Sequence, residues 1–237
     1  MNKTKAIFID CDGVLYDKQY CTYEDIAVVA LEKTLAKYNI PYSEFQTKRI
    51  ELRNKGVHGL INTILKLCKS KGIPFGEFSK EMVKNTDYSR IPKDTEMLKL
   101  LQQAGTVKAI YIVTNNTRPH LEKVLSCLKG EDTPVEFSKL NVYPITIEET
   151  LYDGMFHPKK VTGQFKDLCA AVGEKPQNVL MLDDTQEVCD AAINQGVKTF
   201  LIQCPGDTKT ILKGVINEKP KSKRHFSLWQ TCGKSRP

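Results

Sequence analysis

Short apolar runs alternate with amphipathic stretches along most of the chain, beginning with the run Ala6-Ile-Phe-Ile. Two further runs, at residues 108–113 and 178–182, are apolar throughout, which is typical of buried strands. Weaker runs at 140–143 and 197–202 predict two more strands. Because strands that alternate with helices form parallel sheets with right-handed crossovers, the pattern predicts an α/β fold built on a parallel sheet.

Apolar side chains at three- and four-residue spacing predict the helices of the chain. The expected helices cover residues 22–38, 43–53, 59–70, 76–87, 94–105, 118–129, 160–172 and 185–195. No convincing strand falls between Asp17 and Pro92, so the first four helices form an all-helical insertion after the first strand. Asp153-Gly154 is a candidate hairpin turn. The sequence therefore predicts a core of residues 1–17 and 92–216, a helical insertion of residues 18–91, and a tail of residues 217–237.

The composition, with 41% hydrophobic and 27% charged residues, is that of a globular protein. No apolar run approaches the ~20 residues needed to span a bilayer. The chain enters its first strand without a signal-peptide pattern, and its eight cysteines include no Cys-x-x-Cys pair. We therefore expect a cytoplasmic protein with reduced thiols and no membrane span.

The net charge of +7 is concentrated at the C-terminus. Residues 217–237 carry six Lys or Arg against Glu218, which leaves a net charge of only +2 on the rest of the chain. Phe226 and Trp229 within this tail raise the alternative of contact with nucleic acid or a membrane. Since no periodicity supports such contact, we expect a disordered tail and no nucleic-acid partner.

Two carboxylates stand directly after the first strand. Side chains alternate along an extended chain, so Asp10 and Asp12 project to the same side, and Gly13 allows a sharp turn after them. The repulsion between two such charges is relieved by a divalent cation or by one group remaining protonated. The pair therefore predicts either a nucleophile beside a proton donor or, more simply, a solvated turn.

Polar clusters also follow other strands, and ligand sites in parallel sheets lie beyond the carboxyl ends of the strands. Several carboxylates facing one crevice require a hard cation, for which oxygen ligands suit Mg²⁺. Hydroxyl, amide and ammonium groups are the donors that hold phosphoryl oxygens. The residues therefore predict Mg²⁺-dependent phosphoryl transfer. The further candidates are Thr114, Asn115, Asp183, Asp184, Lys159 and Lys160.

Four segments, DCDGVLYD, YIVTNN, HPKKVTGQF and MLDDT, together resemble the four motifs of the haloacid dehalogenase (HAD) superfamily. The resemblance covers about residues 5–203 and implies a Rossmann-like core. It implies that Asp10 is a nucleophile that forms an aspartyl-phosphate. Asp12 would protonate the leaving oxygen and later activate water.

The same resemblance assigns the remaining site residues. Thr114 and Lys159 would hold the phosphoryl group. Lys160 is an alternative to Lys159, because members of the family usually have Lys-Pro at this place and this chain has Lys-Lys. The Mg²⁺ ligands would be Asp10, the main-chain carbonyl of Asp12 and Asp184, with Asp183 close by. Val188 stands where many members carry an acidic residue or Asn, which predicts weaker metal binding.

The helical insertion corresponds in position to the cap of HAD enzymes, and the stretches GVHGL and DYSRIPKDTEMLKLL resemble pyrimidine 5'-nucleotidase-like members. Arg53 and His58 either reach a substrate from this cap or belong to a solvated helix face. Asn115 and Lys160 are further candidates for substrate contact. The histidines that lack metal-ligand spacing, expected at surface or helix positions, are His120, His157 and His225.

These observations predict a Mg²⁺-dependent phosphomonoester hydrolase that acts on a small phosphorylated metabolite. A nucleoside 5'-monophosphate is a candidate substrate. One alternative is a sugar phosphomutase of the same superfamily, and another is an interaction protein that uses the basic tail. The sequence does not predict the oligomeric state.

Overall fold

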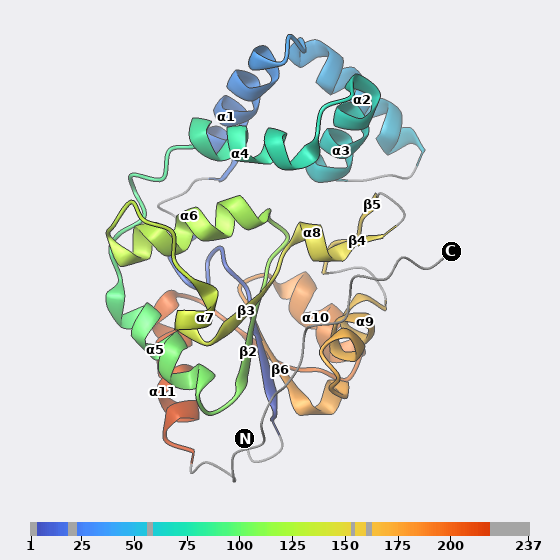
Figure 1. Ribbon diagram of the computed structural model, residues 1–237. Helices are drawn as coiled ribbons and strands as arrows, with labels where there is room; N and C mark the ends of the chain where they lie inside the picture. The colour runs from blue at the N-terminus through green and yellow to red at the C-terminus, as the bar shows by residue number, and fades with distance from the viewer. Residues whose placement is uncertain (1–3, 19–22, 56–58, 153–154, 160–162, 219–237) are drawn as a thin grey trace.

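The computed structural model describes residues 4–18, 23–55, 59–152, 155–159 and 163–218. A five-stranded sheet with the order β3-β2-β1-β6-β7 forms its centre, and every neighbouring pair of strands is parallel (Figure 1). The predicted α/β fold with a parallel sheet is therefore confirmed. The strands are β1 (Ala6–Ile9), β2 (Ala109–Val113), β3 (Val142–Ile145), β6 (Val179–Asp183) and β7 (Lys198–Leu201).

Strand β1 lies in the middle of the sheet, and all four of its residues are buried. Phe8 lies opposite Tyr111 of β2 on one side and Met181 of β6 on the other. This register carries the carboxyl ends of β1, β2 and β6 to the same edge of the sheet. Polar residues that follow these three strands are thereby brought together.

Helices cover both faces of the sheet, because side chains alternate along each strand. Ile7 and Ile9 pack in a core that includes residues of α5 (Thr95–Gly105), α6 (Arg118–Lys129) and α11 (Pro205–Ile216). Phe8 belongs to a second core on the opposite face, with residues of α9 and α10. Figure 1 shows the two sets of helices on either side of the strands. The helices of the second face are α9 (Gln164–Ala171) and α10 (Gln186–Asn194).

Four helices between β1 and α5, here called the helical group, pack around a separate apolar cluster that includes Leu35, Phe45 and Phe78. The group lies beyond the carboxyl end of the sheet (Figure 1). As predicted, the described residues between Asp17 and Pro92 contain no strand. Neither here nor elsewhere in the described part of the chain is a helix long and apolar enough to cross a membrane. The helices are α1 (Tyr23–Lys37), α2 (Tyr42–Asn54), α3 (Leu60–Lys71) and α4 (Phe75–Asn85).

Several elements differ from the sequence prediction. Helix α9 begins at Gln164 rather than 160, and Gly163 at its N-terminus has a left-handed backbone (φ 92°). Helix α11 was not expected, yet its Leu212 and Val215 are fully buried. The turn proposed at 153–154 lies outside the described residues, although β4 and β5 pair antiparallel on either side of it. The remaining short elements are α7 (Phe137–Leu140), α8 (Ile147–Thr150), β4 (Leu151–Tyr152), β5 (Met155–Phe156) and the 3₁₀ helix η2 (Pro176–Asn178).

Candidate active site

Three carboxylates meet at the carboxyl edge of the sheet. Asp10 follows β1, Asp183 ends β6, and Asp184 comes next along the chain. Their nearest carboxylate oxygens all lie within 4.8 Å of one another. Asp10 and Asp183 are buried, with 7% and 1% of their surface exposed. The backbone N–H of Asp10 donates to the carbonyl of Leu182 (2.9 Å), so the sheet itself fixes the distance between the two strand ends.

The ammonium group of Lys159 lies among these acids. Its Nζ is 2.5 Å from Oδ1 of Asp10 and 2.6 Å from Oδ2 of Asp183, and the residue is only 4% exposed. Burial alone would lower the pKa of Lys159, but the charges of Asp10 and Asp183 outweigh it and raise that pKa. The backbone N–H of Lys159 donates to Oδ1 of Asn115 (3.1 Å). Lys159 is therefore a charged lysine that is held in place at both its backbone and its side chain.

Negative charge still exceeds positive charge in this cluster. Burial raises the pKa of Asp10 to about 8, and the charges of Asp183 and Asp12 add to the effect while Lys159 opposes it. Lys18 makes a further ion pair with Asp184 (2.5 Å), but its own side chain is 66% exposed. A buried site with this imbalance favours an additional cation.

The donor set fits Mg²⁺, which prefers carboxylate and carbonyl oxygens. Asp10 and Asp184 supply such oxygens at the edge of the cluster, whereas Asp183 accepts from Lys159 and from the backbone N–H of Thr185 (3.0 Å). Gly13 has φ 81°, and a Cβ at this position would overlap the carboxylate of Asp184. The glycine therefore permits the close approach of Asp184 to the loop after β1.

Asp12 lies in a different environment from Asp10. Its carboxylate accepts hydrogen bonds from the Tyr16 hydroxyl, from Nδ2 of Asn116 (2.7 Å) and from Nε2 of His120 (2.9 Å). Burial would raise the pKa of Asp12, but His120, Tyr16 and Asn116 together lower it to about 2. Nδ1 of His120 lies 2.9 Å from the hydroxyl of Tyr88. Asp12 is thus held as a carboxylate by donors from three parts of the chain.

The loop after β2 links the two halves of the site. Thr114 is 2% exposed, and its backbone N–H donates to the carbonyl of Ile145 (3.0 Å). Its Oγ1 accepts from the backbone N–H of Asn116 (3.1 Å). Asn115 then contacts the backbone of Lys159, while Asn116 contacts Asp12. Three consecutive residues therefore each have a separate position in the site.

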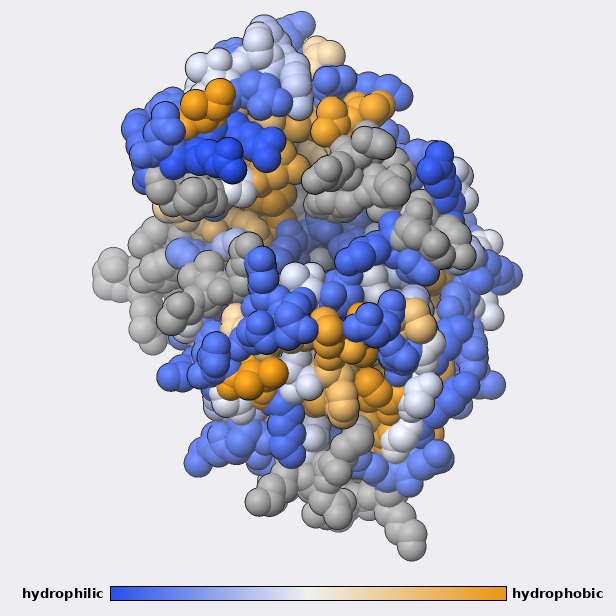
Figure 2. Space-filling model, turned by 180° about the vertical axis from the view of Figure 1, so that it is seen from behind, coloured by the Kyte–Doolittle hydropathy of each residue, from blue (hydrophilic) through white to orange (hydrophobic). Residues whose placement is uncertain are grey.

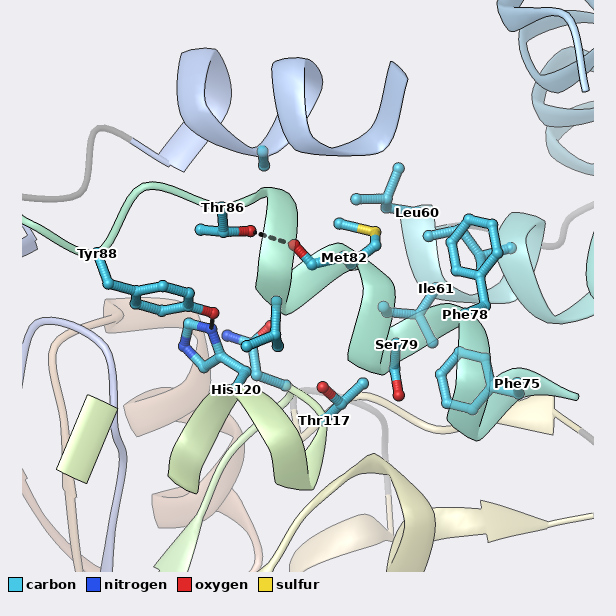
Figure 3. A pocket seen from close by; sticks show the side chains of 14 residues that line it. Leu60, Ile61, Phe75, Phe78, Ser79, Met82, Thr86, Tyr88, Thr117 and His120 are labelled. Carbon is cyan, nitrogen blue, oxygen red and sulfur yellow. Dashed lines mark hydrogen bonds between the residues drawn. The ribbon is translucent and has the colours of Figure 1, made fainter. Parts of the chain in front are cut away.

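A cavity of about 70 Å³ lies between the helical group and α6 (Figure 3). Its walls are mostly apolar side chains of α3 and α4, among them Ile61, Phe75 and Phe78. Asn116 and His120, the two donors to Asp12, also line it. Seen from behind, hydrophobic side chains of the helical group border the hollow between this group and the rest of the molecule (Figure 2). The cavity therefore adjoins the Asp12 half of the site.

The structure brings together most of the residues singled out in the sequence: Asp10, Asp12, Thr114, Asn115, Lys159, Asp183 and Asp184. Arg53 is exposed on α2 of the helical group. His58 and Lys160 lie outside the described residues. Val188 is 4% exposed and packs in the core beneath α10.

Sequence reasoning assigned no role to His120, Tyr88, Tyr16, Asn116 or Lys18. His120 does lie in a helix as expected, but its ring points to Asp12 rather than to solvent. One signal was present: a helix that begins directly after a motif-bearing strand places its first turn at the site. Tyr88 had no such signal, because it belongs to the connection between α4 and α5.

Comparisons with known proteins agree with this architecture. The model of the haloacid dehalogenase-like hydrolases matches residues 4–196. A predicted HAD-like family hydrolase from Porphyromonas gingivalis has 14% identity and a TM-score of 0.52, covering 92% of this chain and 100% of its own. CbbY from Rhodobacter sphaeroides, solved in complex with phosphate, has 14% identity and a TM-score of 0.50, covering 83% of this chain and 84% of its own. These likenesses show a shared fold. No curated protein matches the chain significantly.

Proposed function

The chain belongs to the haloacid dehalogenase-like hydrolases, and we propose that it is a Mg²⁺-dependent phosphomonoester hydrolase that acts through an aspartyl-phosphate. The observation that carries this proposal is the buried ammonium of Lys159, held by Asp10 and Asp183 within a cluster that still has excess negative charge. An anionic phosphoryl group requires such fixed positive charge. Uncatalysed hydrolysis of phosphate monoesters is so slow that enzymes accelerate it by up to ~10²¹-fold, mostly through preorganised electrostatics.

In the proposed reaction, a carboxylate oxygen of Asp10 attacks the phosphorus atom, and the bond between phosphorus and the leaving oxygen breaks. Asp12 is ionised in the free protein, but the negative charge of a bound phosphoryl group favours its protonated form, so it takes up a proton with the substrate. Asp12 then gives this proton to the leaving oxygen, so that the product leaves as an alcohol. In the second step Asp12 accepts a proton from a water molecule that attacks the aspartyl-phosphate, which releases inorganic phosphate and restores Asp10. Thr114 and Lys159 stabilise the charge on the phosphoryl oxygens.

Asp10, the main-chain carbonyl of Asp12 and Asp184 would hold the Mg²⁺ ion, with Asp183 close by. When bound, the ion supplies positive charge that offsets the acids and the phosphoryl oxygens. Asp183 keeps Lys159 oriented, because its Oδ2 accepts from the ammonium. Burial and the neighbouring acids raise the pKa of Asp10 to about 8 even beside Lys159, so the charge of a bound Mg²⁺ ion would be what favours the ionised, nucleophilic form of Asp10.

We further propose a division into a catalytic core of residues 1–17 and 92–216 and a cap of residues 18–91. The mostly apolar cavity between the helical group and α6 supports a small substrate whose leaving group has an apolar face. The base of a nucleoside 5'-monophosphate has this character. Arg53 and His58 on the cap, with Asn115 and Lys160 on the core, remain candidates for substrate contact.

The test is release of inorganic phosphate from a panel of nucleoside monophosphates, sugar phosphates and phosphopeptides, with and without Mg²⁺. We expect Mg²⁺-dependent turnover of small phosphomonoesters without a bisphosphate activator. A requirement for a bisphosphate would instead indicate a phosphomutase. Asp10→Asn should reduce turnover to background, and full activity in this variant would refute the assignment of Asp10 as the nucleophile.

A further inference from the structure

His120 contacts Asp12 from the first turn of α6, although the proposed reaction gives it no task. Its Nε2 lies 2.9 Å from Oδ1 of Asp12, and its side chain is 12% exposed. Its Nδ1 lies 2.9 Å from the hydroxyl of Tyr88, whose ring stands beside the imidazole with 5.6 Å between the ring centroids (Figure 3). The imidazole is therefore fixed on both of its nitrogens.

The direction of these hydrogen bonds follows from the chemistry of the partners. A carboxylate only accepts, so Nε2 of His120 carries a hydrogen and donates it to Asp12. Nδ1 of a neutral imidazole accepts from the Tyr88 hydroxyl, whereas Nδ1 of an imidazolium donates to the hydroxyl oxygen, so Tyr88 holds this nitrogen in either form. Tyr88 is 6% exposed and packs in the core cluster that includes Ile7 and Ile9, so this end of the chain of hydrogen bonds is anchored in the protein interior.

The two oxygens of Asp12 are occupied unequally. Tyr16 and His120 both donate to Oδ1, whereas Asn116 donates to Oδ2. A carboxylate oxygen has about two acceptor positions. Among the described residues, Oδ1 therefore has both of its positions occupied, and Oδ2 has one position open for another partner. Oδ2 is then the oxygen that would exchange a proton with a substrate.

We propose that His120 is a positioning residue: with Tyr16 it holds Oδ1 of Asp12 so that Oδ2 faces the leaving oxygen, and Tyr88 fixes the imidazole for this task. This inference rests on the proposed function of Asp12 as proton donor. The cavity supports it, because His120 and Asn116, which both donate to Asp12, also line the cavity in which we place the leaving group. Loss of the His120 donor leaves Oδ1 with a single hydrogen bond and allows the carboxyl group to rotate.

Two substitutions separate positioning from simple packing. The side-chain amide nitrogen of His120→Gln can reach the place of Nε2, which keeps the donor to Asp12. That of His120→Asn reaches only the place of Nδ1, where it can donate to the hydroxyl oxygen of Tyr88 but not to Asp12. The two substrates are benzyl phosphate, whose alkoxide needs a proton to leave, and 4-nitrophenyl phosphate, whose phenolate leaves without one.

We expect His120→Asn to lower kcat/KM for benzyl phosphate on the order of tenfold more than for 4-nitrophenyl phosphate, since one hydrogen bond to a charged group is lost. His120→Gln should keep the ratio of the two kcat/KM values near that of the wild type. Tyr88→Phe should change this ratio in the same direction as His120→Asn but by less. Equal losses on both esters, or a larger loss in His120→Gln than in His120→Asn, would show that His120 only fills space.

A measurement without turnover tests the contact itself. In the ¹⁵N NMR spectrum of the imidazole groups, the His120 signals are those lost in His120→Gln. They should shift when Asp12 is replaced by Ala, and unchanged signals would overturn the inference. If the wild type hydrolyses neither ester with Mg²⁺, the proposed function fails, while the NMR result still decides whether His120 holds Asp12.

Discussion

Asp10 and Asp12 are separated by one residue on the same loop, yet their surroundings are opposite. Around Asp10, buried acids outnumber the buried cations, and burial raises its pKa to about 8. Around Asp12, despite its burial, His120 and neutral donors lower its pKa to about 2. The protein thus surrounds Asp12 with hydrogen-bond donors of its own, whereas the acids around Asp10 keep an excess of negative charge, which is the arrangement that our proposal completes with a cation. A single strand end supplies two chemical environments because different elements pack against its two sides.

The largest expected effect, on both activity and stability, comes from removing Lys159, the only buried cation described on the Asp10 side. Lys159→Met leaves Asp10 and Asp183 without their ammonium partner, so kcat/KM should fall on the order of 10³-fold. The metal-free variant should also lose ~3–5 kcal/mol of unfolding free energy, which is typical when a buried ion pair is broken. Steady-state kinetics and urea denaturation measure the two effects.

Lys18→Met is the matched control, because Lys18 pairs with Asp184 from an exposed position. Its loss should change the unfolding free energy by about 1 kcal/mol or less, as is usual for exposed pairs. Equal destabilisation by the two variants would contradict the distinction between the buried and the exposed lysine.

Metal binding should stabilise the Asp10 side and leave the Asp12 side unchanged. Mg²⁺ at ~100 times its Kd adds ~2.7 kcal/mol, which corresponds to a rise in Tm of roughly 5 to 10 °C for a chain of this size. Asp184→Asn should remove most of this rise, because it removes one carboxylate ligand. Differential scanning fluorimetry with Mg²⁺ and EDTA provides the measurement. A full rise in Asp184→Asn would exclude Asp184 as a ligand.

The pH dependence of stability should differ between the two acids. In the folded metal-free protein the pKa of Asp10 is about 8, whereas in the unfolded chain it is 3.8. Between these two pH values the folded protein holds a proton that the unfolded chain has released, so the contribution of Asp10 to the unfolding free energy falls as pH rises from 3.8 to about 8. The contribution of Asp12 is present above 3.8 and is lost as pH falls toward about 2. In urea denaturation across this range, Asp10→Asn should reduce the pH dependence of the unfolding free energy between pH 3.8 and about 8. Asp12→Asn should reduce it only between about pH 2 and 3.8. Identical profiles for the two variants would disprove the comparison.

The smallest effects should come from the two neighbouring amides that serve opposite halves. Asn115→Ala frees the backbone of Lys159 and should weaken inhibition by inorganic phosphate several-fold, at a cost of about 1 kcal/mol in stability. Asn116→Ala instead removes a hydrogen bond to Asp12, so it should change the inhibition constant for phosphate less than Asn115→Ala does. Inhibition constants for phosphate decide the point, and the reverse order would mean that the amides are assigned to the wrong halves.

Local pattern was sufficient for the sheet and for the acids. The strands of the centre are uninterrupted apolar runs, and the rule that parallel strands share one carboxyl edge brings Asp10, Thr114 and Asp183 together without further information. Helix α11 was not predicted because its two glycines weaken the local helix signal, while its stability comes from packing Leu212 and Val215 against the rest of the core.

The donors around Asp12 could not be found in the same way. Whether His120 reaches Asp12 depends on the rotation of α6, and Tyr88 reaches His120 only because the return from the helical group packs against the core. Both are tertiary facts that single-sequence periodicity does not contain. The acids of the site can therefore be predicted from local sequence, whereas the groups that shift the pKa values of these acids depend on tertiary packing.

The central place of β1 also has a consequence for how a ribosome makes this protein. Ala6 is paired with Ala109 on one side and with Val179 on the other, so one edge of β1 stays unpaired until residues about 170 positions later in the chain have been translated. Nascent chains that stop before β6 would expose an apolar strand edge that invites aggregation. They would also lack Asp183 and Asp184, so Asp10 would stand without the two acids that complete its cluster in the folded protein.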